Sequence, residues 1–217
     1  MIKDYQVKQI DSHLTYDLIL HKHYAQRKPS ISFAFGLYCQ DVLIGVCTFG
    51  KPASNSLCIG VCGKEYSKQV YELNRLILID GINEKNILSY FVSKCLKFLK
   101  PMDLIIVSYA DEGAGHCGYI YQATNFIYTG KTKERTDKYA PNGKHSRHYT
   151  TEFNYLRKVR TSKHRYIYFT GKRKKEYLKH LNYDIKDYPK VNNVRYVLGE
   201  RIKTKIINKN TNEIYYE

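Results

Sequence analysis

The sequence contains no tryptophan and no CxxC pair, and it has only five prolines in 217 residues. Aromatic contacts must therefore come from tyrosine and phenylalanine. The six cysteines lack a recognised zinc spacing, although Cys58 and Cys62 with a distant histidine remain an alternative. Several cysteines lie inside apolar runs, which indicates buried, reduced thiols and a cytoplasmic protein. No segment approaches the roughly 18 apolar residues of a membrane span, so we expect no membrane partner.

Acidic residues are scarce in the last part of the chain. Residues 131–217 hold 23 Lys and Arg against nine Asp and Glu, whereas residues 1–130 hold 13 against 11. The resulting net charge of +16 implies a polyanionic partner, nucleic acid first and an acidic membrane surface second. A merely soluble basic surface is the alternative. We interpret residues 1–130 as a catalytic core and residues 131–217 as a basic region that completes the sheet and contacts nucleic acid, within one compact domain.

Strands alternate with helices in the hydrophobic pattern. Strands are predicted over residues 32–38, 42–49, 70–79, 104–109, 126–128 and 166–170, with a hairpin in the last 20 residues. Helices are predicted over residues 5–26, 84–99, 116–124 and 173–182. Residues 50–68 look like a loop, and residues 131–165 are polar and basic with little periodicity. The order predicts an α/β (α+β) fold with a mixed central sheet flanked by helices.

Residues 107–130, VSYADEGAGHCGYIYQATNFIYTG, form a long and unusual motif. It is accompanied by His23-Tyr24, by ELNRL at residues 72–76 and by the passage over residues 163–190. The element order resembles the GNAT acyltransferase fold, and these motifs together resemble the Mom family of phage DNA-modification proteins over about residues 20–190. The resemblance implies a GNAT-like enzyme that converts the exocyclic amine of adenine in DNA to a carbamoylmethyl (glycinamide) derivative. This modification protects phage DNA from host restriction enzymes.

The resemblance also bears on cofactors. Iron binding has been suggested for the family, and His23 and Asp111 are the candidate ligands here. Acetyl-CoA is not expected. Acetyl-CoA enzymes of this fold carry a glycine-rich turn whose backbone N–H groups bind pyrophosphate at a helix N-terminus. Residues 80–87 read DGINEKNI, with Gly81 as the one glycine and Glu84 where an anion would bind.

The resemblance implies that His23, Tyr24, Asp111 and Tyr121 are catalytic. A histidine can act as a base or a metal ligand at neutral pH, although His23 also fits a surface position in a basic cluster. Asp111 follows the apolar strand over residues 104–109, at the end where such sheets bind ligands, or it simply caps a turn. Tyr121 can donate a proton, stack on a base or pack in the core.

Three further residues are candidates for substrate binding: Arg75, His116 and Asn125. Strand alternation places Leu73 and Arg75 on one face. An unpaired buried charge is costly, so Arg75 needs a phosphate, or a salt bridge to Asp111 or Glu72. His116 is the first residue of the helix predicted over residues 116–124, and Asn125 directly follows that helix.

The basic region supplies the nucleic-acid-binding candidates. These are Lys163, Arg165, Lys172, Arg173, Lys174 and Lys175, with tyrosines interleaved. The expected partner is DNA, either a duplex with an extruded adenine or a single strand. RNA is a rival that no residue excludes, and a homodimer is left open. Two other functions stay open as well: an acyl-CoA-dependent acyltransferase acting on a protein or small amine, and a non-enzymatic nucleic-acid-binding protein.

Overall fold

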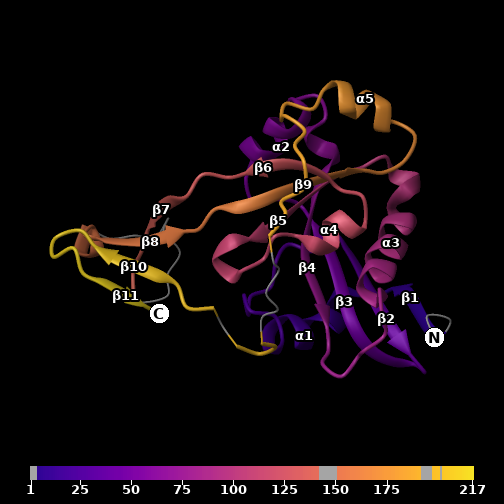
Figure 1. The fold of residues 1–217 in the computed structure, drawn as a ribbon, viewed down its shortest axis with the longest axis horizontal. Helices are drawn as coiled ribbons and strands as arrows, with labels where there is room; N and C mark the ends of the chain where they lie inside the picture. Colours follow the sequence, from indigo (N-terminus) through magenta and orange to yellow (C-terminus); the bar gives the residue numbers. More distant parts are fainter. Residues whose placement is uncertain (1–3, 142–150, 192–196, 201) are drawn as a thin grey trace.

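The computed structural model describes residues 4–141, 151–191, 197–200 and 202–217. Within them the chain forms a seven-stranded sheet of order β1-β2-β3-β4-β5-β9-β6 and a four-stranded sheet of order β11-β10-β8-β7. The two sheets lie side by side, and the C-terminus ends on the smaller one (Figure 1).

The larger sheet is mixed. In spatial order its strands are β1 (Tyr5–Gln9), β2 (Phe33–Cys39), β3 (Val42–Gly50), β4 (Val70–Leu78), β5 (Ile105–Asp111), β9 (Lys163–Phe169) and β6 (Ile127–Lys131). The β4–β5 pair is parallel, and the other neighbours are antiparallel. The smaller sheet consists of β7 (Arg135–Lys138), β8 (Leu156–Arg160), β10 (Lys205–Asn208) and β11 (Ile214–Tyr216). The mixed sheet confirms the predicted class.

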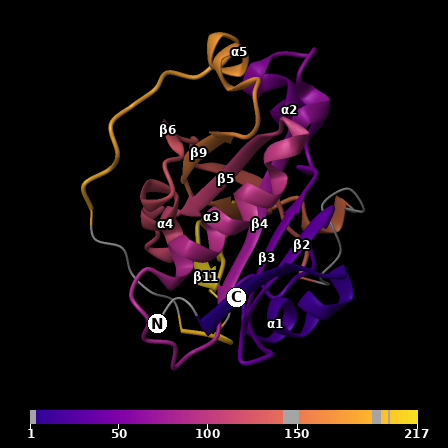
Figure 2. The same cartoon turned by 90° about the vertical axis from the view of Figure 1, so that its right-hand side faces the viewer.

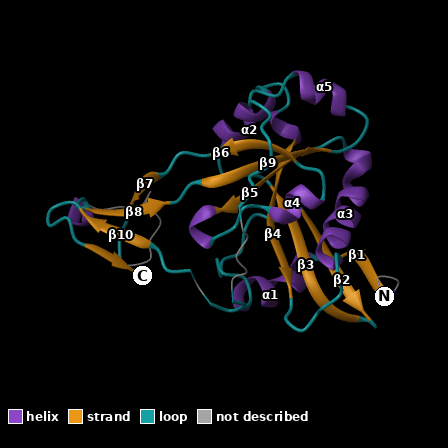
Figure 3. Cartoon of the chain, in the orientation of Figure 1, coloured by secondary structure: helices purple, strands orange, loops and turns teal. Residues whose placement is uncertain are grey.

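Helices cover both faces of the larger sheet (Figures 2 and 3). They are α1 (Tyr16–His21), α2 (Asn55–Cys62), α3 (Ile87–Leu99), α4 (Tyr119–Ala123) and α5 (Lys174–Lys179). On one face, α3 and α4 bury residues such as Phe91 and Tyr121 against the sheet. On the other, α1 packs through Ile19, and α2 and α5 pack through Val61 and Tyr177. None of the described helices is long and apolar enough to cross a membrane.

The prediction of a helix over residues 5–26 is wrong at its start. Residues 5–9 form β1, which pairs with β2 from Tyr5 opposite Cys39 to Gln9 opposite Phe35. Tyr5 and Val7 alternate along this strand and pack on the main core. Pairing with a distant strand decided the conformation here, so the helical part is limited to a 3-10 turn (Ser12–Thr15) and α1.

Two other segments hold more structure than their patterns indicate. Within residues 50–68 lies α2, whose first turn is capped because the Ser54 hydroxyl accepts a hydrogen bond from the Leu57 N–H at 3.3 Å. Residues 131–165 contain β7 and β8, which are stabilised by each other and by β10. The predicted C-terminal hairpin is confirmed as β10 and β11.

The parallel pairing between β4 and β5 is short, and the candidate site lies where this pairing ends. It extends only from Val70 opposite Ile105 to Glu72 opposite Val107. Beyond Glu72, β4 pairs with β3, and beyond Val107, β5 pairs with β9. Where the backbone ladder stops, the Ser108 hydroxyl donates to the Leu73 carbonyl at 2.9 Å. The two strands therefore separate toward their carboxyl ends and leave a gap in the sheet.

Candidate active site

A cavity of about 1760 Å³ lies where β4 and β5 separate. Open α/β sheets bind ligands at the carboxyl ends of such strands. The structure brings seven of the predicted site residues to this cavity: His23, Tyr24, Arg75, Asp111, His116, Tyr121 and Lys163. They come from the segment after α1, from β4, β5 and β9, and from the chain around α4.

Strand β4 does not alternate regularly, which corrects the predicted faces. The pairing with β3 shifts between Arg75, opposite Thr48, and Leu73, opposite Phe49, so Asn74 is a β-bulge. Leu73 packs on the core beneath α3, whereas Ile77, two residues beyond Arg75, packs with α1 on the other face. Leu73 and Arg75 therefore lie on opposite faces, and the bulge brings Arg75 to the same face as Glu72.

Arg75 is held by backbone oxygens and not by an acid. Its Nη1 donates to the Asn74 carbonyl at 2.6 Å and its Nη2 to the Arg27 carbonyl at 2.8 Å. Its Nε is buried without a hydrogen-bond partner among the described residues. Burial lowers the pKa of Arg75, while Tyr24 and Glu72 oppose this effect. No salt bridge to Glu72 or Asp111 forms within the described chain, so Arg75 retains donor capacity toward the cavity.

Glu72 is the site residue that the sequence interpretation missed, apart from its mention as a partner for Arg75. It lines the cavity, and no described residue forms a hydrogen bond or ion pair with its carboxylate. Burial raises the pKa of Glu72, and the charges of Arg75 and Lys163 only partly offset this. A perturbed carboxylate in a cavity is a candidate general base. The signal in the sequence was an acid inside the apolar run of β4.

His23 and Tyr24 form a stacked pair at the cavity, with ring centroids 4.3 Å apart. The Nδ1 of His23 accepts the Ala25 N–H at 3.0 Å, so in the neutral ring the proton sits on Nε2. Burial, assisted by the charge of Arg75, lowers the pKa of His23 to about 3. A group with so low a pKa is a weak base at neutral pH. The geometry favours a positioning role for His23 beside Tyr24.

Tyr24 keeps its phenolic proton at neutral pH. Burial, together with the nearby charge of Asp111, raises the pKa of Tyr24 to about 12. Its ring meets His116 edge-on, with centroids 5.7 Å apart. Burial lowers the pKa of His116, while Asp111 opposes this effect. Tyr24 can therefore act as a hydrogen-bond donor to a ligand in the cavity.

Asp111 is already engaged by the protein. Its carboxylate accepts the Gly113 N–H at 3.0 Å and the Thr161 hydroxyl at 2.6 Å, and it forms an ion pair with Lys163. Asp111 therefore caps the turn that follows it through its Oδ1, as the alternative prediction had it. Asp111 joins the end of β5 to the start of β9, and so it also fixes the mouth of the cavity.

Tyr121 reaches the cavity from the other face of the sheet. Its side chain belongs to the core beneath α3, where it packs on Phe126 and Tyr166 with centroids 5.3 Å away in each case. Burial raises the pKa of Tyr121, and the nearby Ser108 hydroxyl opposes this effect. Gly118 precedes α4 with φ of +82° and contacts the Tyr166 ring so closely that a Cβ would lie 2.3 Å from it. Tyr121 therefore packs in the core, as the alternative prediction had it, and also lines the cavity.

The remaining predicted residues do not line the cavity. Asn125 is exposed in a left-handed turn after α4, with φ of 62°. Arg165 is bound to Thr129, and its guanidinium stacks 3.3 Å from the Tyr183 ring. The four residues over 172–175 lie at α5, away from the cavity lining.

The described residues do not make a complete iron site. No group of three or more His, Cys, Asp or Glu among them is arranged to hold a metal ion. The carboxylate of Asp111 contacts three protein donors, and the Nδ1 of His23 accepts the Ala25 N–H. We therefore derive no step through a metal.

The chain resembles known proteins in sequence and in structure. Residues 4–190 match the Mom protein family. The methylcarbamoylase mom of Escherichia phage Mu is 30% identical over 132 residues, which cover 59% of this chain and 54% of that protein. The match thus spans about half the length of this relative.

Solved acyltransferase structures also align. An N-acetyltransferase from Staphylococcus aureus Mu50 aligns with 12% identity over 76% of this chain and 98% of its own, with a TM-score of 0.48. The ribosomal-protein-S18-alanine N-acetyltransferase from Escherichia coli aligns with 8% identity over 77% and 95%, with a TM-score of 0.46. Since the family match covers most of the sequence, including every element that lines the cavity from α1 to β9, the chain belongs to the Mom protein family.

Proposed function

We propose that this chain is a DNA-modifying transferase that attaches a carbamoylmethyl group to the exocyclic amine of adenine and thereby protects phage DNA from restriction. Membership of the Mom family supports this proposal, as does the name methylcarbamoylase carried by the phage Mu relative. The net charge of +16 suits a polyanionic substrate. The cavity is large enough to receive an extruded base, which an enzyme acting on this amine requires.

The observation that carries the proposal is the pair Glu72 and Arg75. Both lie on one face of β4 at the cavity, and neither is neutralised by an ion pair within the described residues. Buried charges are costly when unpaired, so the site keeps one basic carboxylate and one guanidinium for a ligand.

The chemistry needs one proton acceptor. The exocyclic nitrogen of adenine attacks the methylene carbon of the donor, the N–C bond forms, and the leaving group departs with its electron pair. The nitrogen then carries an extra proton, which Glu72 accepts. A carboxylate with a raised pKa is a better acceptor than an ordinary one, whereas His23, with its pKa near 3, is a poor one.

Two other groups orient the reactants. The guanidinium of Arg75, whose Nε–H has no hydrogen-bond partner among the described residues, would hold an oxygen of the donor, either of a carboxamide or of the leaving group. Tyr24 stays protonated and can donate a hydrogen bond to a ring nitrogen or to the same oxygen. Asp111 holds Lys163 and the β5–β9 corner in place beside them.

The test is mass spectrometry of nucleosides from the DNA of cells that express the chain. The wild type should yield deoxyadenosine with the added mass of one carbamoylmethyl group. Glu72→Gln should lose the product by about 10²–10⁴-fold, the range for removal of a general base. Unmodified adenine with the folded wild-type protein would overturn the proposal, and full activity of Glu72→Gln would remove Glu72 from the mechanism.

A further inference from the structure

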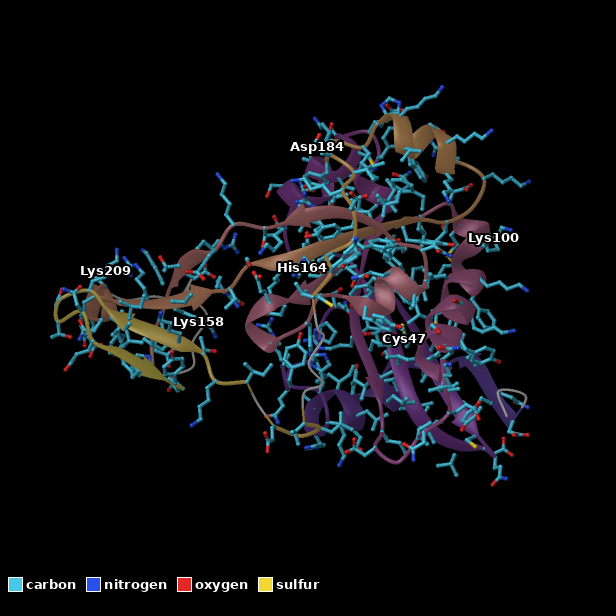
Figure 4. All side chains as sticks on the ribbon, in the orientation of Figure 1. Cys47, Lys100, Lys158, His164, Asp184 and Lys209 are labelled. Carbon is cyan, nitrogen blue, oxygen red and sulfur yellow. The ribbon has the colours of Figure 1, made fainter. Side chains whose placement is uncertain are left out.

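Two groups of basic residues lie in different parts of the molecule. One group is at α5, where the sequence predicts the nucleic-acid contacts over residues 172–175. The other is on the smaller sheet, where Figure 4 places Lys158 and Lys209. In Figure 1 the smaller sheet lies at the left and α5 at the upper right, with the larger sheet between them. Only the group on the smaller sheet contributes residues to the cavity lining.

The smaller sheet forms one side of the cavity, and that side is strongly basic. Its lining residues include six Lys or Arg and one acid, Glu134. The six, here called the basic wall, are Lys133, Arg135, Lys158, Arg160, Lys203 and Lys205. Lys133 precedes β7, and Lys203 precedes β10, so separate segments of the chain converge on this surface.

The fold leaves much of this charge uncompensated. Within the basic wall, Arg160 and Arg135 share a single acid, Asp137, at 2.7 and 3.6 Å. In the described chain, no acid forms an ion pair with Lys133, Lys203 or Lys205. Lys133 and Lys203 are exposed. Like charges held together cost free energy, which a bound polyanion offsets.

The α5 group is arranged differently. Arg173 is committed to a bidentate pair with Glu176, at 2.8 and 2.6 Å, and stacks near Tyr177. None of the residues over 172–175 lines the cavity. A phosphate backbone bound there would therefore lie outside the lining of the cavity that holds Glu72.

We propose that the basic wall is the surface on which duplex DNA docks, with its phosphate backbone along the smaller sheet and the target adenine turned into the adjoining cavity. This inference rests on the proposed function and adds the location of the DNA, which differs from the α5 site expected from the sequence. Phosphate contacts of this kind position the duplex and carry no base specificity.

The experiment compares two matched triple variants. Lys133→Gln/Lys203→Gln/Lys205→Gln alters the basic wall, and Lys172→Gln/Lys174→Gln/Lys175→Gln alters α5, so both remove three lysine charges. Binding of a fluorescent duplex is measured by anisotropy across a salt series, with thermal unfolding as a check that each variant folds.

The basic-wall variant should bind duplex DNA on the order of 10–100-fold more weakly, and its log–log salt slope should flatten by about 0.9 for each phosphate that the variant no longer neutralises. The α5 variant should match the wild type. The reverse pattern, or equal losses of affinity in both variants, would overturn the proposed surface. Stronger wild-type binding to duplex RNA of the same sequence would overturn the choice of DNA.

Glu72→Gln separates this inference from the proposed function. It should bind DNA with the wild-type salt slope, because it lies outside the basic wall. If the basic wall carries binding but no adenine is modified by the wild type, the docking surface stands and the enzymatic proposal falls. If adenine is modified while the basic-wall variant binds normally, the enzymatic proposal stands and the docking surface falls.

Discussion

At the scale of single residues, the raised pKa of Glu72 bears both on its proposed role as a proton acceptor and on the stability of the fold. Burial raises its pKa, so the folded state binds the proton more tightly than the unfolded state does. The stability that protonated Glu72 contributes is fully present below the unfolded pKa and is lost as the pH rises through the folded pKa. A site that keeps such a charge at neutral pH gives up stability for activity.

Glu72→Gln should therefore unfold at a higher temperature than the wild type at pH 8, by about 2–4 °C for each kcal/mol recovered, while modification is lost. At pH 4 the two proteins should be much closer. Thermal unfolding at both pH values checks this. The exposed Glu65→Gln serves as control and should change neither property. A lower melting temperature for Glu72→Gln at pH 8 would contradict the assignment.

Asp111 is expected to behave as a structural anchor. Asp111→Asn removes the ion pair with Lys163 and retains only part of the acceptor capacity for Gly113 and Thr161. We expect a loss of about 1–2 kcal/mol of unfolding free energy, along with reduced activity. The unfolding free energy can be measured by chemical denaturation of Asp111→Asn, of Lys163→Met and of the double variant. Because the two groups are in contact, the losses should be less than additive. Additive losses would show that the ion pair is not important.

The lowered pKa of His23 predicts that the folded protein loses stability in acid. Its pKa is about 3 in the folded state and near 6.5 when unfolded, so the unfolded state takes up the proton first. The stability contributed by the neutral ring is present above pH 6.5 and is lost as the pH falls toward 3, by up to about 1.4 kcal/mol per pH unit. Urea denaturation across this range should show a flatter profile for His23→Gln than for wild type. The exposed His13→Gln should leave the profile unchanged.

At the scale of elements, the bulge in β4 decides which way Arg75 points. Asn74 is held there by its amide, which donates to the Ser30 carbonyl at 2.8 Å, and by the Thr48 hydroxyl, which donates to Asn74 at 2.6 Å. Thr48 is fully buried on β3 opposite Arg75. The local sequence of β4 contains no glycine or proline that would have indicated a bulge.

Thr48→Val removes one hydrogen bond to the bulge and keeps the shape of the side chain. We expect a loss of about 1–3 kcal/mol of stability, since the partly buried Asn74 oxygen loses its hydrogen-bond donor. Modification activity should fall at temperatures where the variant is still folded, because Arg75 loses its fixed direction. Thr136→Val, at an exposed position of β7, is the control. Unaltered activity in folded Thr48→Val would show that the bulge does not orient Arg75.

At the scale of the whole molecule, the absence of tight acetyl-CoA binding remains a prediction. The loop before α3 has Gly81 as its one glycine, and the helix begins after Asn86, whose side chain does not cap it. Pyrophosphate binding at a helix N-terminus needs several backbone N–H groups presented together. Titration calorimetry should detect no micromolar affinity. Such an affinity would favour an acyl-CoA-dependent acyltransferase.

Much of the molecule follows from local sequence. Helix α3 could be predicted because its apolar residues recur at helical spacing, and β2 and β3 because an apolar hairpin flanks Gln40-Asp41, both with positive φ. In contrast, α2 and β1 depend on distant partners. Helix α2 buries Cys58, Val61 and Cys62 against β5 and β9. Strand β1 pairs with β2 at the edge of the larger sheet. Neither partner is visible in a short window of sequence.

The amino-acid sequence by itself determined the mixed α+β class, the family and the basic character of residues 131–217, and it indicated seven of the residues that line the cavity. Only the tertiary structure decided which charges stay unpaired. The bulge in β4 places Glu72 and Arg75 on one face, and Asp111 forms an ion pair with Lys163. The basic wall lines the cavity, whereas residues 172–175 at α5 do not. The physical reason is that periodicity and composition are local, whereas burial, pKa and pairing depend on segments that meet only when the chain folds.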